Sequence, residues 1–374
     1  MKKVLFVATI TKTINTFLIP YLKMFKEKGY EVHVASNGNE QIEYCDKHFN
    51  ILFERFPLKL KNIKAYKELK NIIKNNEYEI VHCHTPVAGV LTRLAVRKAR
   101  KKGTKLIYTA HGFHFYKGAP LLNWIIYFPI EKICARWTDC ITTINKEDYE
   151  FAKKHLKIKQ VEYVHGVGMD TSRFERKLTC EEKLKFRKSL GINEDDIVFT
   201  YVAELNKNKN QILLINTIKE LKKKKENIKL LLVSEGPLYN YYKEIIERED
   251  LQNNVKLLGK RTDINEILSI TDIYLASSIR EGLGLNVVEA MYKDLPVLAT
   301  ENRGHKELVE NNVNGYLVND TKDFKEFCNK IEQISKDKKL YNCFSSNSKE
   351  KSKKFNLKNS LDKFEIIYQK LINE

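Results

Sequence analysis

Two carboxylates have the spacing and the surroundings of a ligand site. Glu281 and Glu289 lie eight positions apart in the segment 278–291, which reads S-I-R-E-G-L-G-L-N-V-V-E-A-M. The preceding run Ile273–Ala276 is typical of a buried strand, and Leu285–Tyr292 has helical periodicity. Glu281 is therefore expected at the carboxyl end of a strand, where open α/β sheets bind their ligands. Each carboxylate offers two oxygens that can accept hydrogen bonds from a sugar diol.

The expected helix start supplies a second kind of recognition. The backbone N–H groups of Gly284, Leu285, Asn286 and Val287 would face the same crevice, and the N-terminus of a helix attracts phosphate. The spacing alone also fits a helix-capping acid at Glu281 and a solvated or salt-bridged Glu289. The expected strand at 296–300 and the expected helix at 303–309 favour the ligand site.

In this context the segment resembles the nucleotide-sugar site of retaining glycosyltransferases of family 4, which have the GT-B architecture. The family pattern reads roughly E-G-x-G-x-x-x-x-E-A-M, and every marked position is filled, by Glu281, Gly282, Gly284, Glu289, Ala290 and Met291. The resemblance implies that Glu289 accepts hydrogen bonds from the ribose hydroxyls of the donor. It also implies that Glu281 lies beside the transferred sugar as a catalytic residue.

The loop after the expected strand at residue 200 resembles the part of the family that neutralises the donor diphosphate. Lys209 matches the usual Lys, whereas Glu204 stands where an Arg is usual. We therefore expect Lys207 or Arg261 to substitute for that Arg, or backbone donors to contribute more. Without the resemblance, Lys207 and Lys209 would fit a solvated basic loop.

Two further loops resemble the family's donor-binding loops. The segment 231–237, L-L-V-S-E-G-P, resembles a strand that ends in G-x-G-P, with Ser234 in place of the first Gly and Glu235 at the donor. The segment 255–264 resembles the strand whose following loop receives the base, at Lys260 and Arg261. Asp263 is expected to cap the helix that follows.

The N-terminal half alternates between expected strands and helices. We predict a strand at Val4–Ala8, a helix at Thr16–Lys28 and a strand at Glu31–Ala35. A later strand starting at 106 would place His111 at its carboxyl end. By resemblance, His111 reaches across the interdomain cleft toward the donor sugar as a catalytic residue, and His114 lies on the acceptor side. Loop histidines are also often structural.

The loop after the first strand departs from the family pattern. It reads T-I-T-K-T-I-N-T over 9–16 and lacks the usual glycines. Thr11, Asn15 and Thr16 are candidate side-chain donors, with Asn15 on the acceptor side, and Asn15 or Thr16 is alternatively a helix cap. His82 and His84 lie on one face of an expected strand without further metal ligands, so we interpret them as cleft or core residues.

The length of 374 residues and the 43% hydrophobic content fit two domains. We predict an α/β chain of GT-B type with two Rossmann-like domains facing a cleft. The expected parts are an N-terminal acceptor domain at 1–168, a C-terminal nucleotide-sugar domain at 169–355, and a C-terminal helix at 356–374 that crosses back to the N-terminal domain.

The seven cysteines include no C-x-x-C pair, so we expect reduced thiols, no structural zinc site and a cytoplasmic location. No run approaches the ~18 apolar residues of a membrane span. The formal net charge is +18, yet no nucleic-acid motif is visible and nucleic acid is not expected as a partner. The apolar segment 118–130, together with Arg97, Lys98 and the basic residues 100–102, fits either peripheral docking on an anionic membrane or a buried core helix.

The predicted function is retaining transfer of a hexosyl or N-acetylhexosaminyl residue from a nucleotide diphosphate sugar, most simply a UDP-sugar. The expected acceptor is a glycan or a polyprenyl-diphosphate-linked sugar of surface polysaccharide synthesis. No D-x-D triplet occurs, so no metal cofactor is expected. Two other readings remain open, namely a nucleotide-sugar 2-epimerase of the same architecture and a basic module that binds membrane or nucleic acid.

Overall fold

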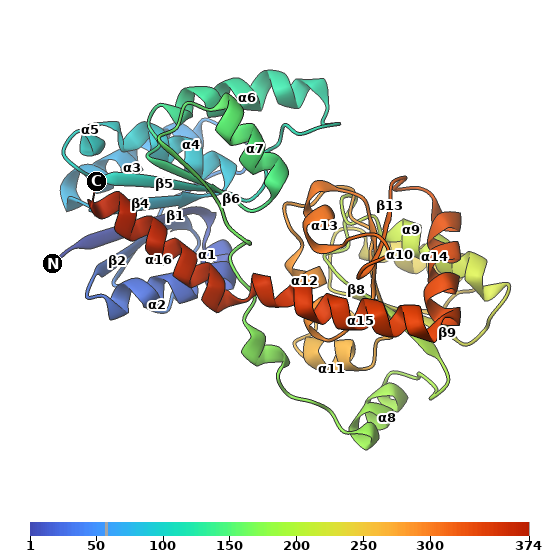
Figure 1. Cartoon of the computed structure of the whole chain (residues 1–374). Helices are drawn as coiled ribbons and strands as arrows, with labels where there is room; N and C mark the ends of the chain where they lie inside the picture. The colour runs from blue at the N-terminus through green and yellow to red at the C-terminus, as the bar shows by residue number, and fades with distance from the viewer. Residues whose placement is uncertain (57–58, 374) are drawn as a thin grey trace. The chain divides into compact units, whose positions relative to one another are not determined.

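The computed structural model describes residues 1–56 and 59–373, and these residues form two compact units. The first contains Met1–Gly168 and the C-terminal residues from Lys358, and the second contains Met169–Leu357. Each unit is built on one parallel sheet with helices packed against it (Figure 1). The predicted pair of Rossmann-like α/β domains is therefore confirmed.

The first unit has a seven-stranded sheet in the order β3-β2-β1-β4-β5-β6-β7. The residues of its central strands are mostly buried, because both faces of the sheet are covered by helices. The strands are β1 (Lys3–Ile10), β2 (Glu31–Asn37), β3 (Lys47–Asn50), β4 (Ile80–His84), β5 (Lys105–Ala110), β6 (Cys140–Thr143) and β7 (Gln160–Tyr163).

The helices of the first unit include the last helix of the chain. They are α1 (Thr11–Phe17), α2 (Ile19–Glu27), α3 (Lys61–Asn76), α4 (Pro86–Ala95), α5 (Arg97–Arg100), α6 (Leu121–Ala135), α7 (Lys146–His155) and α16 (Leu357–Asn373). Ser360 and Tyr368 of α16 hydrogen-bond Tyr21 and His82 of this unit at 2.7 and 2.6 Å. The C-terminal helix therefore packs on the N-terminal sheet.

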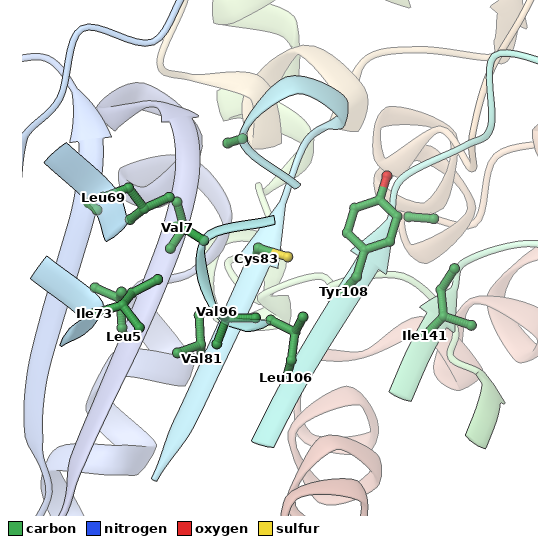
Figure 2. Packing of buried hydrophobic residues seen from close by; sticks show 14 of the residues in the cluster. Leu5, Val7, Leu69, Ile73, Val81, Cys83, Val96, Leu106, Tyr108 and Ile141 are labelled. Carbon is green, nitrogen blue, oxygen red and sulfur yellow. The ribbon is translucent and has the colours of Figure 1, made fainter. Parts of the chain in front are cut away.

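One part of the core of the first unit lies between one face of its sheet and helices that include α3 and α4 (Figure 2). Residues two apart on a strand share a face, so each central strand contributes a pair of side chains. These are Leu5 and Val7 of β1, Val81 and Cys83 of β4, and Leu106 and Tyr108 of β5, packed with Leu69 and Ile73 of α3 and with Val96.

The predicted helix Thr16–Lys28 is wrong at its start. Helix α1 begins at Thr11, directly after β1, and Pro20 lies in the first turn of a separate helix, α2. Proline is tolerated in a first turn but not in a helix interior, so Pro20 divides the two helices. Neither Asn15 nor Thr16 caps α2, because both belong to α1 and the cap position of α2 is Leu18.

The second unit has a six-stranded parallel sheet in the order β10-β9-β8-β11-β12-β13. Its first strand begins at Ile197, and β11 occupies the predicted Ile273–Ala276. The strands are β8 (Ile197–Val202), β9 (Ile228–Val233), β10 (Val255–Leu257), β11 (Ile273–Ala276), β12 (Val297–Thr300) and β13 (Gly315–Val318).

The helices of the second unit connect these strands. They are η1 (Thr171–Phe174), α8 (Cys180–Ser189), α9 (Gln211–Lys222), α10 (Tyr239–Arg248), α11 (Ile264–Ser269), α12 (Leu285–Tyr292), α13 (Arg303–Leu308), α14 (Phe324–Lys336), α15 (Lys338–Ser352) and η2 (Lys353–Phe355). Among the described residues of both units, no helix combines the length and apolar character needed to cross a membrane.

Candidate active site

Two loops of the second unit meet at the carboxyl end of its sheet, one after β8 and one after β11. The amide of Ile279 donates to the carbonyl of Asn208 at 2.8 Å, and Asn208 Nδ2 donates to the carbonyl of Arg280 at 2.9 Å. Ser277 Oγ donates to the carbonyl of Lys209 at 2.7 Å. These bonds bring the predicted residues Lys209 and Glu281 together.

Lys209 and Glu281 form a largely buried ion pair. Lys209 Nζ donates to Oε1 of Glu281 over 2.5 Å, and the two side chains are 21% and 14% exposed. Burial alone would raise the pKa of Glu281, but the charge of Lys209, the nearby His305 and the hydrogen bonds from Lys209 and Ser278 together hold the pKa below its ordinary value. Glu281 is therefore an ionised acceptor, and Lys209 is the cation paired with it.

The N-terminus of α12 follows this loop. Gly284 is the residue before the helix and has φ +99°, a conformation that favours glycine. Asn286 Nδ2 donates to the carbonyl of Val202 and to the hydroxyl of Tyr274 at 2.9 and 3.0 Å. The Asn286 side chain thus fixes the helix to β8 and β11, which leaves the backbone N–H groups of Leu285 and its neighbours as the donors for a phosphate.

Glu289 lies on α12, one turn after the helix start, and its side chain is 17% exposed. Burial raises its pKa to about 7, and Arg173 of η1, at 3.7 Å, offsets only part of that effect. Glu289 and Glu281 both contribute, after burial, to a raised pKa of Tyr274. Both carboxylates are therefore close enough for their charges to act on this one buried tyrosine.

His305 and Gly304 support Glu281, and the sequence pattern alone indicated only a helix for them. A Cβ on Gly304 would lie 2.8 Å from the Cβ of Glu281 and 2.8 Å from the amide nitrogen of Leu283. His305 is buried, its Nδ1 lies 2.7 Å from the carbonyl oxygen of Thr300, and the Glu281 charge acts on its pKa. The absent side chain at Gly304 is what lets α13 approach the Glu281 loop so closely.

The other residues that were predicted to bind the donor are either exposed or already paired with an acidic side chain. Lys207 and Glu235 are exposed, and the carbonyl of Glu235 accepts from the amide of Leu205 at 3.0 Å. Arg261 Nε donates to Oδ1 of Asp263 at 2.8 Å, so its guanidinium already has an anionic partner. Asp263 is the N-cap residue of α11, as predicted, but its carboxylate binds Arg261 instead of the amides of the first turn.

In the first unit, His111 follows β5 and belongs to a row of ring contacts. Its Nε2 lies 3.1 Å from Nδ1 of His84, whose ring lies 4.1 Å from that of His82, centroid to centroid. His82 in turn contacts Tyr368 and Thr109 at 2.6 and 2.7 Å. Burial lowers the pKa of His111 to about 4, so the ring is neutral at pH 7.

The residues predicted on the acceptor side do not form one group in the structure. Asn15 Nδ2 donates to the carbonyl of Gln41 at 3.0 Å, which ties α1 to the segment after β2. Thr11 is buried against Ser36, and Thr16 donates to the carbonyl of Lys12 within α1. His114 stacks near Tyr127, with ring centroids 4.7 Å apart, and lines a cavity of about 370 Å³. The cavity also has Thr9, Thr13 and Arg55 in its wall, which the sequence did not single out.

Among residues 1–56 and 59–373, no group of three or more His, Cys, Asp or Glu side chains is placed to hold a metal ion. The seven cysteines are free thiols.

Two family models match the two halves of the chain. Residues 3–145 match the model for glycosyl transferase 4-like proteins, and residues 182–351 match the model for glycosyl transferases group 1. EpsD of Bacillus subtilis (strain 168), which is named as a glycosyltransferase, is 45% identical over 334 residues, or 89% of this chain and 87% of EpsD. The chain therefore belongs to this glycosyltransferase family and is an enzyme with the GT-B architecture.

A second relative and a solved structure are more distant. The UDP-Gal:alpha-D-GlcNAc-diphosphoundecaprenol alpha-1,3-galactosyltransferase of Escherichia coli is 28% identical over 346 residues, covering 90% of this chain and 87% of that enzyme. The crystal structure of HepE from Anabaena in complex with UDP-glucose has a TM-score of 0.80 and 21% identity, covering 99% of this chain and all of HepE. At 21% identity, the similarity to HepE shows only that the two proteins share a fold.

Proposed function

We propose that the enzyme transfers a hexosyl or N-acetylhexosaminyl residue from a UDP-sugar, with retention of anomeric configuration, to a glycan or a polyprenyl-diphosphate-linked sugar. The observation that carries the donor assignment is the arrangement of Glu281, Lys209, Glu289 and the N-terminus of α12 around one sheet edge. Glu289 binds the ribose hydroxyls, Lys209 and the first amides of α12 bind the diphosphate, and Glu281 binds the transferred sugar.

The reaction breaks the bond between the anomeric carbon and the diphosphate oxygen. The acceptor hydroxyl attacks from the side that the diphosphate leaves, and the departing phosphate oxygen takes its proton. Negative charge develops on the diphosphate, and Lys209 and the helix N-terminus are preorganised to stabilise it. We assign neutral His111 of the first unit to the hydroxyls of the donor sugar. These residues supply charge stabilisation and positioning without requiring a metal.

The acceptor assignment is supported by the relative from E. coli, whose name states a diphosphoundecaprenol-linked acceptor. A lipid-linked acceptor would place this enzyme at the cytoplasmic face of a membrane. Leu121, Leu122, Ile125 and Ile126 of α6 are each between 42% and 73% exposed. An exposed apolar row of this kind on a basic protein is suited to peripheral binding at an anionic surface.

A donor panel tests the proposal. Purified protein is incubated with UDP-, GDP- and ADP-sugars, and thermal shift and slow nucleotide release are recorded for the wild type and for Glu289→Ala. We expect stabilisation by UDP-sugars that is lost in the variant, because the ribose contact is removed. A response that survives Glu289→Ala would contradict the ribose assignment. Conversion of the donor to an epimer without acceptor would contradict glycosyl transfer.

A further inference from the structure

A cavity of the second unit lies at the opposite edge of the sheet from the candidate donor site. The donor loops follow the carboxyl ends of β8 and β11, whereas the cavity wall includes Asp272 directly before β11 and Leu295 shortly before β12. All strands of this sheet are parallel, so residues that precede strands and residues that follow them lie at opposite edges. The cavity measures about 750 Å³, within the range of small-molecule sites. It is therefore separate from the site assigned to the donor.

Basic side chains dominate the wall of this cavity, which we call the lysine cavity. They come from the segment before α8, from α8, from the end of α12 and from α15, and they outnumber the acidic side chains by five to three. The basic residues are Lys177, Lys183, Arg187, Lys293 and Lys349, and the acidic residues are Glu175, Asp272 and Asp294.

The acidic side chains do not neutralise this wall. The carboxylate of Asp272 accepts from the amide of Val198 at 2.7 Å, and that of Asp294 lies 3.6 Å from Nζ of Lys349. Glu175 is exposed to solvent. Among the residues that the structure describes, Lys349 is therefore the one basic residue of the wall with an acidic side chain at ion-pair distance.

Lys293 follows the last turn of α12, is partly buried and has neutral partners. Its Nζ donates to Oδ1 of Asn265 at 2.9 Å and to the carbonyl of Phe174 at 3.4 Å. Burial lowers the pKa of Lys293, and the charges of Lys349 and Lys183 lower it further. The cations of the lysine cavity are thus close enough to repel one another, and a bound anion would relieve that repulsion.

We propose that the lysine cavity is a second ligand site, which binds the phosphate group of a small molecule between α8, α12 and α15. Lysine is a common phosphate ligand, because each ammonium group donates charge-assisted hydrogen bonds to the phosphate oxygens. A concave wall favours a small molecule over a membrane or a nucleic acid, which need a more open surface. The inference goes beyond the proposed function, since sugar transfer requires no ligand at this edge of the sheet.

Calorimetry of the full-length protein saturated with UDP tests this site. UDP fills the diphosphate position of the donor site, so inorganic diphosphate added afterwards reports on a second site. We expect one further binding event. The double variant Lys177→Gln, Lys183→Gln should weaken it at least roughly tenfold, because two unmatched charges are removed. Both lysines are exposed, so the variant should keep the wild-type Tm and UDP affinity.

The double variant Lys185→Gln, Lys188→Gln is the matched control. It removes the same net charge from exposed positions of α8 that lie outside the cavity wall, so diphosphate affinity should change little. Ribose 5-phosphate is titrated in parallel with diphosphate. The tighter of the two probes shows whether the phosphate belongs to a phosphorylated metabolite or to a free phosphate anion.

Three results would overturn the inference. They are no diphosphate or ribose 5-phosphate binding by the UDP-saturated wild type, equal binding by the wild type and the Lys177→Gln, Lys183→Gln variant, and equal weakening in both double variants. None of these results concerns UDP affinity itself, so the glycosyltransferase proposal would stand. Loss of UDP binding by the wild type would instead contradict that proposal.

Discussion

At the residue scale, the pKa values of the two carboxylates are shifted in opposite directions, although both residues belong to one segment. Lys209 keeps Glu281 ionised, whereas burial raises the pKa of Glu289 to about 7. The sequence predicted that both bind a ligand, from their types and spacing. It did not predict the difference, because that depends on Lys209 and Arg173, which are distant in the sequence and reach the site only through folding.

The raised pKa of Glu289 predicts a pH dependence of donor binding. Ribose hydroxyls donate to a carboxylate, so the ionised form binds and the protonated form binds less well. UDP-sugar affinity should therefore rise by roughly tenfold between about pH 6 and about pH 8, as Glu289 loses its proton. Calorimetric titration across this range measures it, with Glu289→Gln as control. The variant should bind weakly and show no such rise, and a flat profile in the wild type would contradict the assignment.

The contact between His84 and His111 predicts the tautomer of His111. Nε2 of His84 is buried and has no hydrogen-bond partner among the described residues. An unpaired buried N–H is rarer than an unpaired acceptor, so we expect the proton of His84 on Nδ1, donated to Nε2 of His111. His111 then carries its own proton on Nδ1.

Nitrogen-15 NMR of labelled histidine rings distinguishes the two tautomers, and His111→Gln assigns the signal. His84→Leu removes the donor and should shift His111 away from the Nδ1–H form. His84→Asn keeps a donor close to the same place and should preserve it. Finding Nε2–H on His111 in the wild type would refute this tautomer assignment.

At the element scale, the strands and helices around the donor site follow the sequence closely. The strand β11 and the helix α12 occupy the predicted residues because a buried parallel strand and an amphipathic helix have distinct apolar periods. The start of α1 was missed because T-I-T-K-T-I-N-T has weak helical character. The position of α1 is set by tertiary contacts, such as the hydrogen bond of 2.9 Å between the hydroxyls of Thr11 and Ser36. The cavity between α4 and α6 was not predicted because it depends on how α4 packs beside α6.

The close approach of α13 to the Glu281 loop predicts that Gly304→Ala damages catalysis. The added Cβ would meet Glu281 and Leu283 at 2.8 Å, so the loop must move. We expect kcat/KM to fall by at least roughly tenfold, with little change in Tm. Lys306→Ala, an exposed position on the same helix, is the control and should leave kcat/KM unchanged. Wild-type kinetics in Gly304→Ala would contradict this prediction, because the Glu281 loop could then move without loss of activity.

At the scale of the whole molecule, a net charge of +18 accompanies the exposed apolar row on α6. Composition revealed the charge but not its partner, since Lys-rich sequences also arise from compositional bias. The structure adds a basic hollow in the first unit, lined by Lys70, Arg97, Lys98 and Lys101 together with Trp137. A protein with these features should bind anionic lipid without crossing the bilayer.

Flotation with vesicles measures this binding. We expect the wild type to float with phosphatidylglycerol-containing vesicles and to be released by salt, since exposed charges are screened. The double variant Ile125→Glu, Ile126→Glu should float several-fold less, because it replaces exposed apolar side chains with acids. Equal flotation of both proteins would show that α6 is not the contact.

We infer that Glu289 binds the donor and that Glu281 acts on the transferred sugar. Steady-state kinetics with varied UDP-sugar tests it most directly, comparing Glu289→Ala with Glu281→Ala. We predict that Glu289→Ala mainly raises the donor KM, while Glu281→Ala mainly lowers kcat, because only the second contact involves the reacting sugar. Equal effects of the two variants on both parameters would contradict the account.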